Sequence, residues 1–270
     1  MRKFFKDSDD FFYIINSQVK SVKSISQIST GWTNFVFRVK ARGGTYIFRF
    51  PRNNFFSKQL EKECAFLASF DHTLLSVKIP KMKLCSFIGR PFSVHKALKG
   101  KPLSKCKLHF WQKQKLARSA AKFLMELSSI HTSVPLPTTS EFLRQLSLVS
   151  GTGYELKKHT PLLYAERRGL VLSHGDFNPG NILIRHGKMC GVLDFAFVSY
   201  SSPLDDIARL VGRMPTLKDF MFYQLEKIGF DASDKALVMQ ICGVWDYVEQ
   251  RYIEYIKREH PDIILPEKES

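Results

Sequence analysis

The sequence predicts an α+β protein of two lobes, a small β-rich lobe followed by a larger, mainly helical one. Before residue 97 the chain contains runs of aromatic and β-branched residues, which are typical of strands. Beyond residue 103 the apolar residues recur at the spacing of a helix. The chain has 270 residues, 44% of them hydrophobic, so it can bury the core of a large domain or of two joined lobes.

The predicted first lobe spans residues 1–97. Residues 35–39 and 46–50 form two strands, and Gly43 and Gly44 between them suit a hairpin turn. Small polar residues precede the first of these strands and are typical of a flexible loop.

A helix, two extended segments and a linker complete this lobe. The helix is predicted from apolar residues that recur at helical spacing: Leu60, Cys64, Leu67 and Ala68. Segments 81–87 and 91–97 are extended, and the glycine and proline of residues 98–103 mark a linker. The second lobe is therefore expected at residues 104–270.

The second lobe is predicted to be helical with one interruption. Its first helix has an apolar stripe comprising Leu116, Ala120, Phe123, Leu124, Leu127 and Ile130. Helical patterning returns near residues 203, 217 and 236, and the last helix is long. Between these helices lie a polar loop at residues 173–180 and a hairpin whose turn is formed by residues 185–188.

The net charge of +16 comes entirely from the first half of the chain. Residues 1–140 carry 25 Lys and Arg against 7 Asp and Glu, whereas residues 141–270 carry 16 against 18. Such an excess favours a polyanionic partner, for which RNA, membrane lipid and a nucleotide are alternatives. Because no run of five basic residues occurs, the sequence predicts a dispersed basic surface and not a nucleic-acid-binding tail.

Cysteine spacing and hydropathy argue against several classes of protein. The five cysteines include no C-x-x-C pair, so neither a disulfide scaffold nor a zinc site is indicated. No stretch of eighteen apolar residues occurs, and Asp7, Asp9 and Asp10 interrupt the N-terminal segment before a signal peptide could form. We therefore expect a soluble, cytoplasmic protein without a membrane partner.

The hairpin predicts where the ends of its strands lie. With the turn at residues 185–188, Ile184 pairs with Met189, and continuing this register puts Asn181 opposite about Val192. Asp194 then falls at the same open end as Asn181.

Three oxygen-bearing side chains are thus expected to converge, because the loop that carries Asp176 leads directly into the hairpin. The carbonyl of Asn181 and the carboxylate of Asp194 are hard oxygen donors that suit Mg²⁺ shared with substrate phosphate oxygens. Asp176 is not needed as a ligand and can accept the proton of an attacking hydroxyl. A base, metal ligands and a cationic clamp are the parts that phosphoryl transfer requires.

The same residues resemble a known family, the aminoglycoside phosphotransferase and choline kinase superfamily. Residues 174–181, His-Gly-Asp-Phe-Asn-Pro-Gly-Asn, match its H-G-D-x-x-x-x-N loop, and Leu193-Asp194-Phe195 matches its metal-binding segment. The resemblance implies a bilobal, protein-kinase-like fold and an enzyme that uses ATP and Mg²⁺ to phosphorylate a hydroxyl group of a small molecule. It implies Asp176 as the catalytic base and Asn181 and Asp194 as the metal ligands.

The resemblance also implies a nucleotide site in the first lobe. The segment with Gly31 and Asn34 stands where the family has its nucleotide loop, although it holds only one glycine. Arg49 stands where the family usually has the lysine that contacts phosphate, and a guanidinium can clamp phosphate oxygens in the same way. Glu63 resembles the glutamate that orients this cation.

Two further residues are expected to support the catalytic loop. His174 is predicted to hydrogen-bond to the loop backbone, and Asp206 is predicted to cap a helix or brace the loop.

The acceptor is expected at the last helix. Trp245, Asp246 and Glu249 combine an aromatic face with carboxylates, which suits an amine-bearing acceptor, and a helix with an ordinary packing stripe is the alternative. Choline-like alcohols, amino sugars, sugar alcohols and homoserine-like amino acids remain open as acceptors.

Two other functions remain as alternatives. A catalytically silent relative would bind nucleotide as a scaffold. A basic nucleic-acid-binding protein would account for the net charge, although the catalytic motif does not call for a nucleic-acid partner. The sequence predicts no particular oligomeric state.

Overall fold

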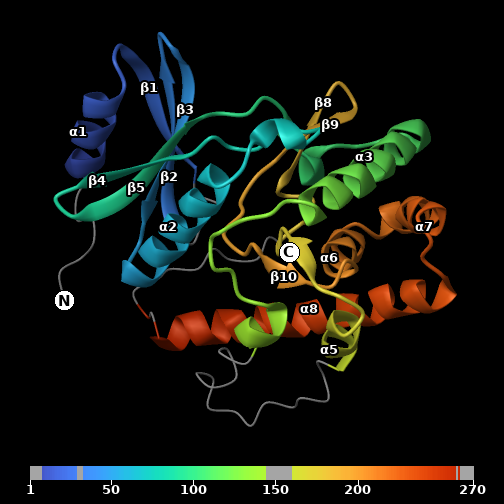
Figure 1. Cartoon of the computed structure of the whole chain (residues 1–270). Coiled ribbons are helices and arrows are strands. Elements are labelled where there is room, and N and C mark those ends of the chain that lie inside the picture. The colour runs from blue at the N-terminus through green and yellow to red at the C-terminus, as the bar shows by residue number, and fades with distance from the viewer. Residues whose placement is uncertain (1–7, 29–32, 144–159, 260, 262–270) are drawn as a thin grey trace. The chain divides into compact units, whose positions relative to one another are not determined.

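The computed structural model describes residues 8–28, 33–143, 160–259 and 261, shown in Figure 1. The described residues divide into two compact units. Residues up to 69 and residues 80–98 form the first unit, and residues 70–79 and 99–259 form the second. Residues 70–79 fell in the predicted first lobe, but Lys78 exchanges backbone hydrogen bonds with Cys190 (3.2 Å) and Val192 (2.9 Å) of the second unit.

The first unit is built on an antiparallel sheet of five strands in the order β1-β2-β3-β5-β4. These strands are β1 (Val22–Ile28), β2 (Asn34–Ala41), β3 (Gly44–Pro51), β4 (Lys83–Phe87) and β5 (Arg90–Lys96). In the β2–β3 hairpin Ala41 pairs with Gly44, and the φ of Gly44 is 127°, a value that glycine adopts readily. The predicted hairpin is present, and β1 is a strand that the sequence analysis did not identify.

Helices α1 (Ser8–Gln18) and α2 (Asn54–Ala68) cover opposite faces of this sheet. Phe48 and Phe50 of β3 belong to the same buried cluster as Ile15 of α1. Arg49, which lies between them and points to the other face, hydrogen-bonds to Glu63 of α2. Because successive side chains of a strand point to opposite faces, the sheet has an aromatic core on the face under α1. It has buried charged side chains on the face under α2.

The second unit is mainly helical. Its helices are α3 (Phe110–Ser128), α5 (Thr160–Glu166), α6 (Asp205–Arg213), α7 (Lys218–Lys227) and α8 (Ala232–Glu259), with single 3-10 turns at η1 (His72–Leu74), η2 (Leu103–Lys105) and η4 (Pro215–Leu217). Helix α8 packs against α5 and α6, and α3 packs against α7 (Figure 1). A β-rich unit and a mainly helical unit confirm the predicted fold class.

Short strands hold the loops of the second unit. Strand β7 (Val171–Ser173) pairs with β10 (Ser199–Ser201), and β6 (Lys101–Pro102) pairs with β8 (Ile182–Arg185), which pairs with β9 (Lys188–Val192). The loop between β7 and β8 is the polar segment singled out in the sequence.

The β8–β9 hairpin differs from the predicted register by one residue. Ile184 pairs with Met189 as predicted, and the turn residues His186 (φ 50°) and Gly187 (φ 70°) have the left-handed conformations of a tight hairpin turn. A β-bulge then places Ile182, and not Asn181, opposite Val192. The predicted Asn181–Val192 pairing is therefore wrong, because one extra residue in β9 shifts the register.

The packing of α1 on the sheet makes a testable contribution to stability. Ile15 is fully buried, so we expect Ile15→Ala to lower the free energy of unfolding by about 2–5 kcal/mol. Ser17→Ala, on the exposed side of the same helix, should change it by less than about 0.5 kcal/mol. Urea denaturation followed by near-UV circular dichroism measures both, and equal effects of the two substitutions would show that α1 does not pack as described.

Candidate active site

The loop between β7 and β8 is closed by its own hydrogen bonds. The backbone N–H of Asn178 donates to the carbonyl of Asp176 (2.9 Å), and the backbone N–H of Gly180 donates to Oδ1 of Asn178 (2.7 Å). The backbone N–H of Asn181 donates to the carbonyl of Asn178 (3.0 Å). These contacts fold the segment into a tight turn and bring residues 176 and 181 side by side.

The carboxylate of Asp176 is held by two amides. Oδ1 accepts a hydrogen bond from Nδ2 of Asn178 (2.8 Å), and Oδ2 accepts one from Nδ2 of Asn181 (2.9 Å). Nδ2 of Asn181 also donates to the carbonyl of Asp176 (3.0 Å). The two hydrogen bonds thus fix the orientation of the carboxylate. Each oxygen still has a lone pair that can accept another hydrogen bond.

Burial raises the pKa of the Asp176 carboxyl to about 6. The positive charge of Arg209 lowers this pKa, the negative charge of Asp194 raises it, and the hydrogen bonds from Asn178 and Asn181 lower it again. The group is mainly ionised at neutral pH, and its pKa is close enough to neutrality for it to take up and release a proton.

Asp194 lies just after β9, in a segment that is hydrogen-bonded to the end of the loop. The backbone N–H of Leu193 donates to the carbonyl of Asn181 (2.8 Å), which ties the start of this segment to the end of the loop. Asp194 itself has a φ of 63°, a left-handed conformation that is uncommon outside glycine. Its charge raises the pKa of both Asp176 and His174. The structure therefore brings Asp176 and Asn181 into contact, and Asp194 directly follows the residue whose backbone bonds to Asn181.

The ring of His174 holds the loop in place through hydrogen bonds. The ring is fully buried, with Nε2 2.9 Å from the carbonyl oxygen of Leu193, and Nδ1 accepts the backbone N–H of Asp176 (3.2 Å). This pair of contacts requires the neutral ring with its proton on Nε2. Burial lowers the pKa of His174 to about 4, so the ring keeps this form at neutral pH.

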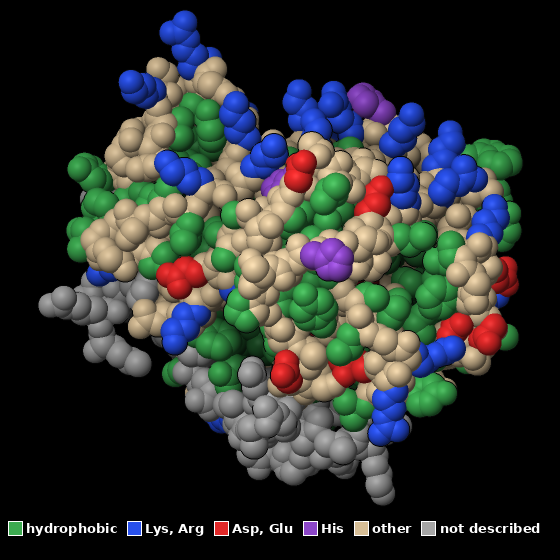
Figure 2. Space-filling model, viewed as in Figure 1, with side chains coloured by type: hydrophobic (Ala, Val, Ile, Leu, Met, Phe, Trp, Pro, Cys, Tyr) green, Lys and Arg blue, Asp and Glu red, His purple; other side chains and the backbone are tan. Residues whose placement is uncertain are grey.

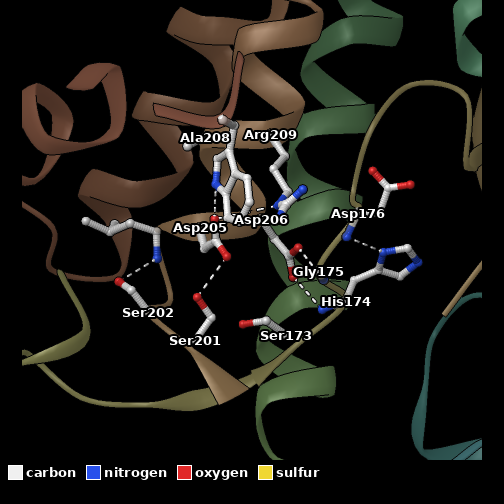
Figure 3. A network of polar contacts seen from close by, with 12 residues as sticks. Ser173, His174, Gly175, Asp176, Ser201, Ser202, Asp205, Asp206, Ala208 and Arg209 are labelled. Atoms are coloured by element: carbon white, nitrogen blue, oxygen red, sulfur yellow. Dashed lines mark hydrogen bonds and ion pairs between the residues drawn. The ribbon is translucent and has the colours of Figure 1, made fainter. Parts of the chain in front are cut away.

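Asp206, in the first turn of α6, braces the start of the loop (Figure 3). Its Oδ2 accepts the backbone N–H of His174 (2.7 Å), and its Oδ1 accepts that of Gly175 (3.0 Å). Gly175 has a φ of 77°, and a Cβ there would lie 1.9 Å from the carbonyl oxygen of Phe197. The glycine is thus required both by its conformation and by the close approach of the neighbouring backbone.

Sequence reasoning missed Arg209. Figure 3 shows it beside Asp205 and Asp206. Its guanidinium lies 3.3 Å from the centre of the Trp245 ring, and its Nε lies 3.6 Å from Oδ1 of Asp205. This cation offsets the negative charge of the buried carboxylates. A signal was present, because Asp205 and Arg209 are four residues apart on a helix.

The predicted acceptor residues are engaged with other side chains. Trp245 is buried and donates its indole N–H to Asp205, while it stacks on Arg209. Both carboxylates predicted to bind an amine pair with Arg213, Asp246 at 3.8 Å and Glu249 at shorter range.

The predicted nucleotide residues lie in the first unit. Nη1 of Arg49 donates to Oε1 (2.9 Å) and Oε2 (2.8 Å) of Glu63, and both side chains are buried. Asn34, at the start of β2, is buried and donates from Nδ2 to Oγ1 of Thr33 (2.8 Å). Gly31 lies outside the residues that the structure describes.

The donor chemistry of the loop and hairpin fits a hard divalent cation. Because Nδ2 of Asn181 is used by Asp176, its carbonyl oxygen Oδ1 is left to face a ligand. An amide carbonyl and the carboxylate of Asp194 are the oxygen donors that Mg²⁺ prefers when phosphate and water complete its shell. Within the described part of the chain, no cluster of three or more His, Cys, Asp and Glu side chains offers an all-protein metal site.

Comparison with known proteins identifies related sequences and folds. A sequence model described as the phosphotransferase enzyme family matches residues 24–224. The GDP complex of wild-type aminoglycoside 2'-phosphotransferase-IIIa is similar in structure, with a TM-score of 0.74 and 20% identity over 95% of this chain and 94% of that one. No curated protein sequence matches the chain.

Two other solved structures share the fold. The apoenzyme of macrolide 2'-phosphotransferase MphH from Brachybacterium faecium has a TM-score of 0.66 and 14% identity over 96% of this chain and 98% of that one. The ternary complex of streptomycin, ATP and APH(2")-IIa has a TM-score of 0.64 and 17% identity over 94% and 96%. Among the helices that the structure describes, none has the length and apolar character to cross a membrane.

The buried Arg49–Glu63 pair makes a testable prediction. Glu63→Ala leaves the Arg49 guanidinium buried without its carboxylate, so we expect it to cost about 3–5 kcal/mol of folding free energy. The double substitution Arg49→Met with Glu63→Leu removes both charges and should recover most of that loss. Urea denaturation of the two proteins measures the difference, and a double variant no more stable than Glu63→Ala contradicts this electrostatic account.

Proposed function

Because the chain belongs to the phosphotransferase enzyme family, we propose that it transfers the γ-phosphate of ATP to a hydroxyl group of a small molecule in the presence of Mg²⁺. One observation carries this proposal. The carboxylate of Asp176 accepts a hydrogen bond from the amide of Asn181, and Asp194 directly follows Leu193, whose backbone N–H donates to the carbonyl of Asn181 (2.8 Å). This arrangement supports a proton acceptor with two oxygen donors for a cation beside it, which phosphoryl transfer needs.

In the proposed reaction Asp176 orients the acceptor hydroxyl and takes its proton. The amides of Asn178 and Asn181 fix the direction of the carboxylate's lone pairs. The carboxylate would therefore orient the hydroxyl oxygen toward the γ-phosphate as well as bind it. Neutral His174 and the carboxylate of Asp206 keep the loop backbone in place. Arg209 keeps the base ionised against the effect of burial.

Asn181 and Asp194 would hold the cation through Oδ1 and a carboxylate oxygen. When bound, Mg²⁺ offsets the charge of the phosphate oxygens during transfer. In the first unit, Arg49 would contact phosphate oxygens and Glu63 would orient it through their paired hydrogen bonds. Gly31 and Asn34 would belong to the nucleotide loop.

The proposed acceptor is an amino alcohol, an amino sugar or a similar molecule. One solved structure holds streptomycin together with ATP and another is named a macrolide 2'-phosphotransferase, so proteins of this fold take chemically different small molecules. At α8 an acceptor amine would compete with Arg213 for Asp246 and Glu249 and would meet only the rim of buried Trp245. We propose a cytoplasmic enzyme, because its five cysteines are all free thiols, the form that a reducing compartment maintains.

A nucleotide-binding scaffold without activity is the second candidate. The hydrogen bond between Asp176, the proposed base, and Asn181, a proposed metal ligand, favours the enzyme. Incubation with labelled ATP, Mg²⁺ and a panel of amino alcohols, amino sugars, sugar alcohols and hydroxy amino acids separates the two. Transfer of label to any acceptor rejects the scaffold, whereas nucleotide binding without transfer or hydrolysis supports it.

Asp176→Asn tests the base. The amide keeps the shape and can still accept the hydrogen bond from Nδ2 of Asn178, but it cannot accept a proton and loses the hydrogen bond from Nδ2 of Asn181, so we expect phosphate transfer to fall by about 100-fold or more. Nucleotide affinity, measured by isothermal titration calorimetry, should change by less than about twofold. Asp219→Asn, an exposed aspartate of α7, serves as the control and should leave both quantities unchanged. Retained turnover in Asp176→Asn removes this residue from the role of base.

Asp194→Asn tests the cation site. Loss of its charge should raise the Mg²⁺ concentration needed for half-maximal rate by about tenfold or more. Binding of Mn²⁺ in the presence of nucleotide, followed by electron paramagnetic resonance, gives a second readout that does not depend on catalysis. If both quantities match those of Asp219→Asn, Asp194 does not ligate the cation.

A further inference from the structure

A basic groove lies in the second unit, apart from the loop that carries Asp176. It has a volume of about 570 Å³ and runs between the segment after β6 and the turn of the β8–β9 hairpin. Lys101, Lys105 and Lys107 line one wall, and Arg185 and His186 line the other. All five side chains are exposed, so the charges of the three lysines and the arginine face solvent inside the groove.

The charge of this groove is not neutralised locally. Residues 99–118 contain seven Lys and Arg and no Asp or Glu, and residues 182–192 contain two basic residues and no acidic one. Within the described residues, none of the lysines or the arginine that line the groove forms an ion pair. Figure 2 shows lysine and arginine side chains gathered along this edge of the second unit. Part of the net charge of +16 is therefore concentrated in one concave surface.

Two exposed aromatic side chains lie next to groove-lining residues in the chain. Leu108 and Gln112 line it, and between them in the first turn of α3 lie Phe110, which is 60% exposed, and Trp111, which is 69% exposed. The two rings meet edge to face at 5.2 Å. Phe110 is also anchored on Phe220 of α7 at 5.1 Å, so the rings are carried by a rigid element.

We propose that this groove binds single-stranded nucleic acid. Lysine and arginine on both walls would contact the phosphates, and unpaired bases would stack on the exposed ring of Trp111 beside Phe110. A concave surface with cations on two walls favours a strand lying between them over a flat bilayer, which touches only the rims. Exposed aromatic rings favour a single strand over a duplex, whose bases are already stacked. The proposal uses none of the residues of the phosphotransfer site and does not depend on that activity.

Fluorescence anisotropy with a labelled single strand of about ten nucleotides tests the proposal. We expect Lys105→Glu with Arg185→Glu to weaken binding at least tenfold and to reduce the dependence of affinity on salt concentration. Trp111→Ala removes a mostly exposed ring and should weaken binding about tenfold without changing the charge. Circular dichroism checks that each variant keeps its helix content.

The matched control reverses the same amount of charge elsewhere. Arg38→Glu with Lys40→Glu changes two exposed cations of β2 in the first unit, and binding should then fall less than about threefold. Equal losses in the control and groove variants, or no measurable binding by the wild type, overturn the proposal. Two further results also overturn the proposal. In the first, the protein binds heparin as tightly as the single strand, and Trp111→Ala does not change heparin binding, which shows that the groove binds any polyanion. In the second, the protein prefers anionic vesicles to the single strand, and the groove variants abolish vesicle binding.

Discussion

The hydrogen bond from the Asn181 side-chain amide to the Asp176 carboxylate is the contact on which the active site depends. At 2.9 Å it joins the residue that can accept a proton to a residue that can donate oxygen to a cation. The same nitrogen also binds the backbone carbonyl of Asp176, so the side chain of Asn181 has one orientation available, with Oδ1 turned away. In the proposed reaction the two ends of this one amide would have different roles, the nitrogen orienting the base and the oxygen binding the cation.

The surrounding contacts keep this amide and carboxylate in position. The backbone hydrogen bond between Leu193 and Asn181 holds the segment with Asp194 against the loop. The ring of His174 contacts the carbonyl of Leu193 in the same segment. Asp206 holds the two backbone N–H groups at the start of the loop. Such a network is cooperative, because the loss of one contact leaves buried polar groups without partners.

Charge in the second unit is arranged in two opposite ways. Nε of Arg209 lies 3.6 Å from Oδ1 of Asp205, and its charge lowers the pKa of Asp176 and Asp206, so one cation partly offsets these carboxylates. The lysines and the arginine of the groove form no ion pair with any residue that the structure describes. The first arrangement suits a site that must move a proton, and the second suits a surface that attracts an anion.

Local patterns in the sequence were sufficient to predict much of this structure. The β2–β3 hairpin, helices α2, α3 and α8, and the contact between Asp176 and Asn181 all follow from spacing within a few residues or across one hairpin. The bulge in β9 was missed because nothing in the alternation of apolar and polar residues marks the extra residue. The setting of Arg209 and Trp245 was missed because their contact joins α6 to α8 across a long stretch of sequence. The concentration of basic residues into one groove likewise depends on how the segment after β6 meets the hairpin.

A crystal structure with Mn²⁺ and a non-hydrolysable ATP analogue tests the central claim most directly, because anomalous scattering locates the metal without reference to activity. The account predicts one Mn²⁺ bound to Oδ1 of Asn181 and to the carboxylate of Asp194 at about 2.0–2.3 Å, with the Asp176 carboxylate outside its coordination shell. A metal bound by Asp176 in place of Asn181, or found away from all three residues, would contradict it.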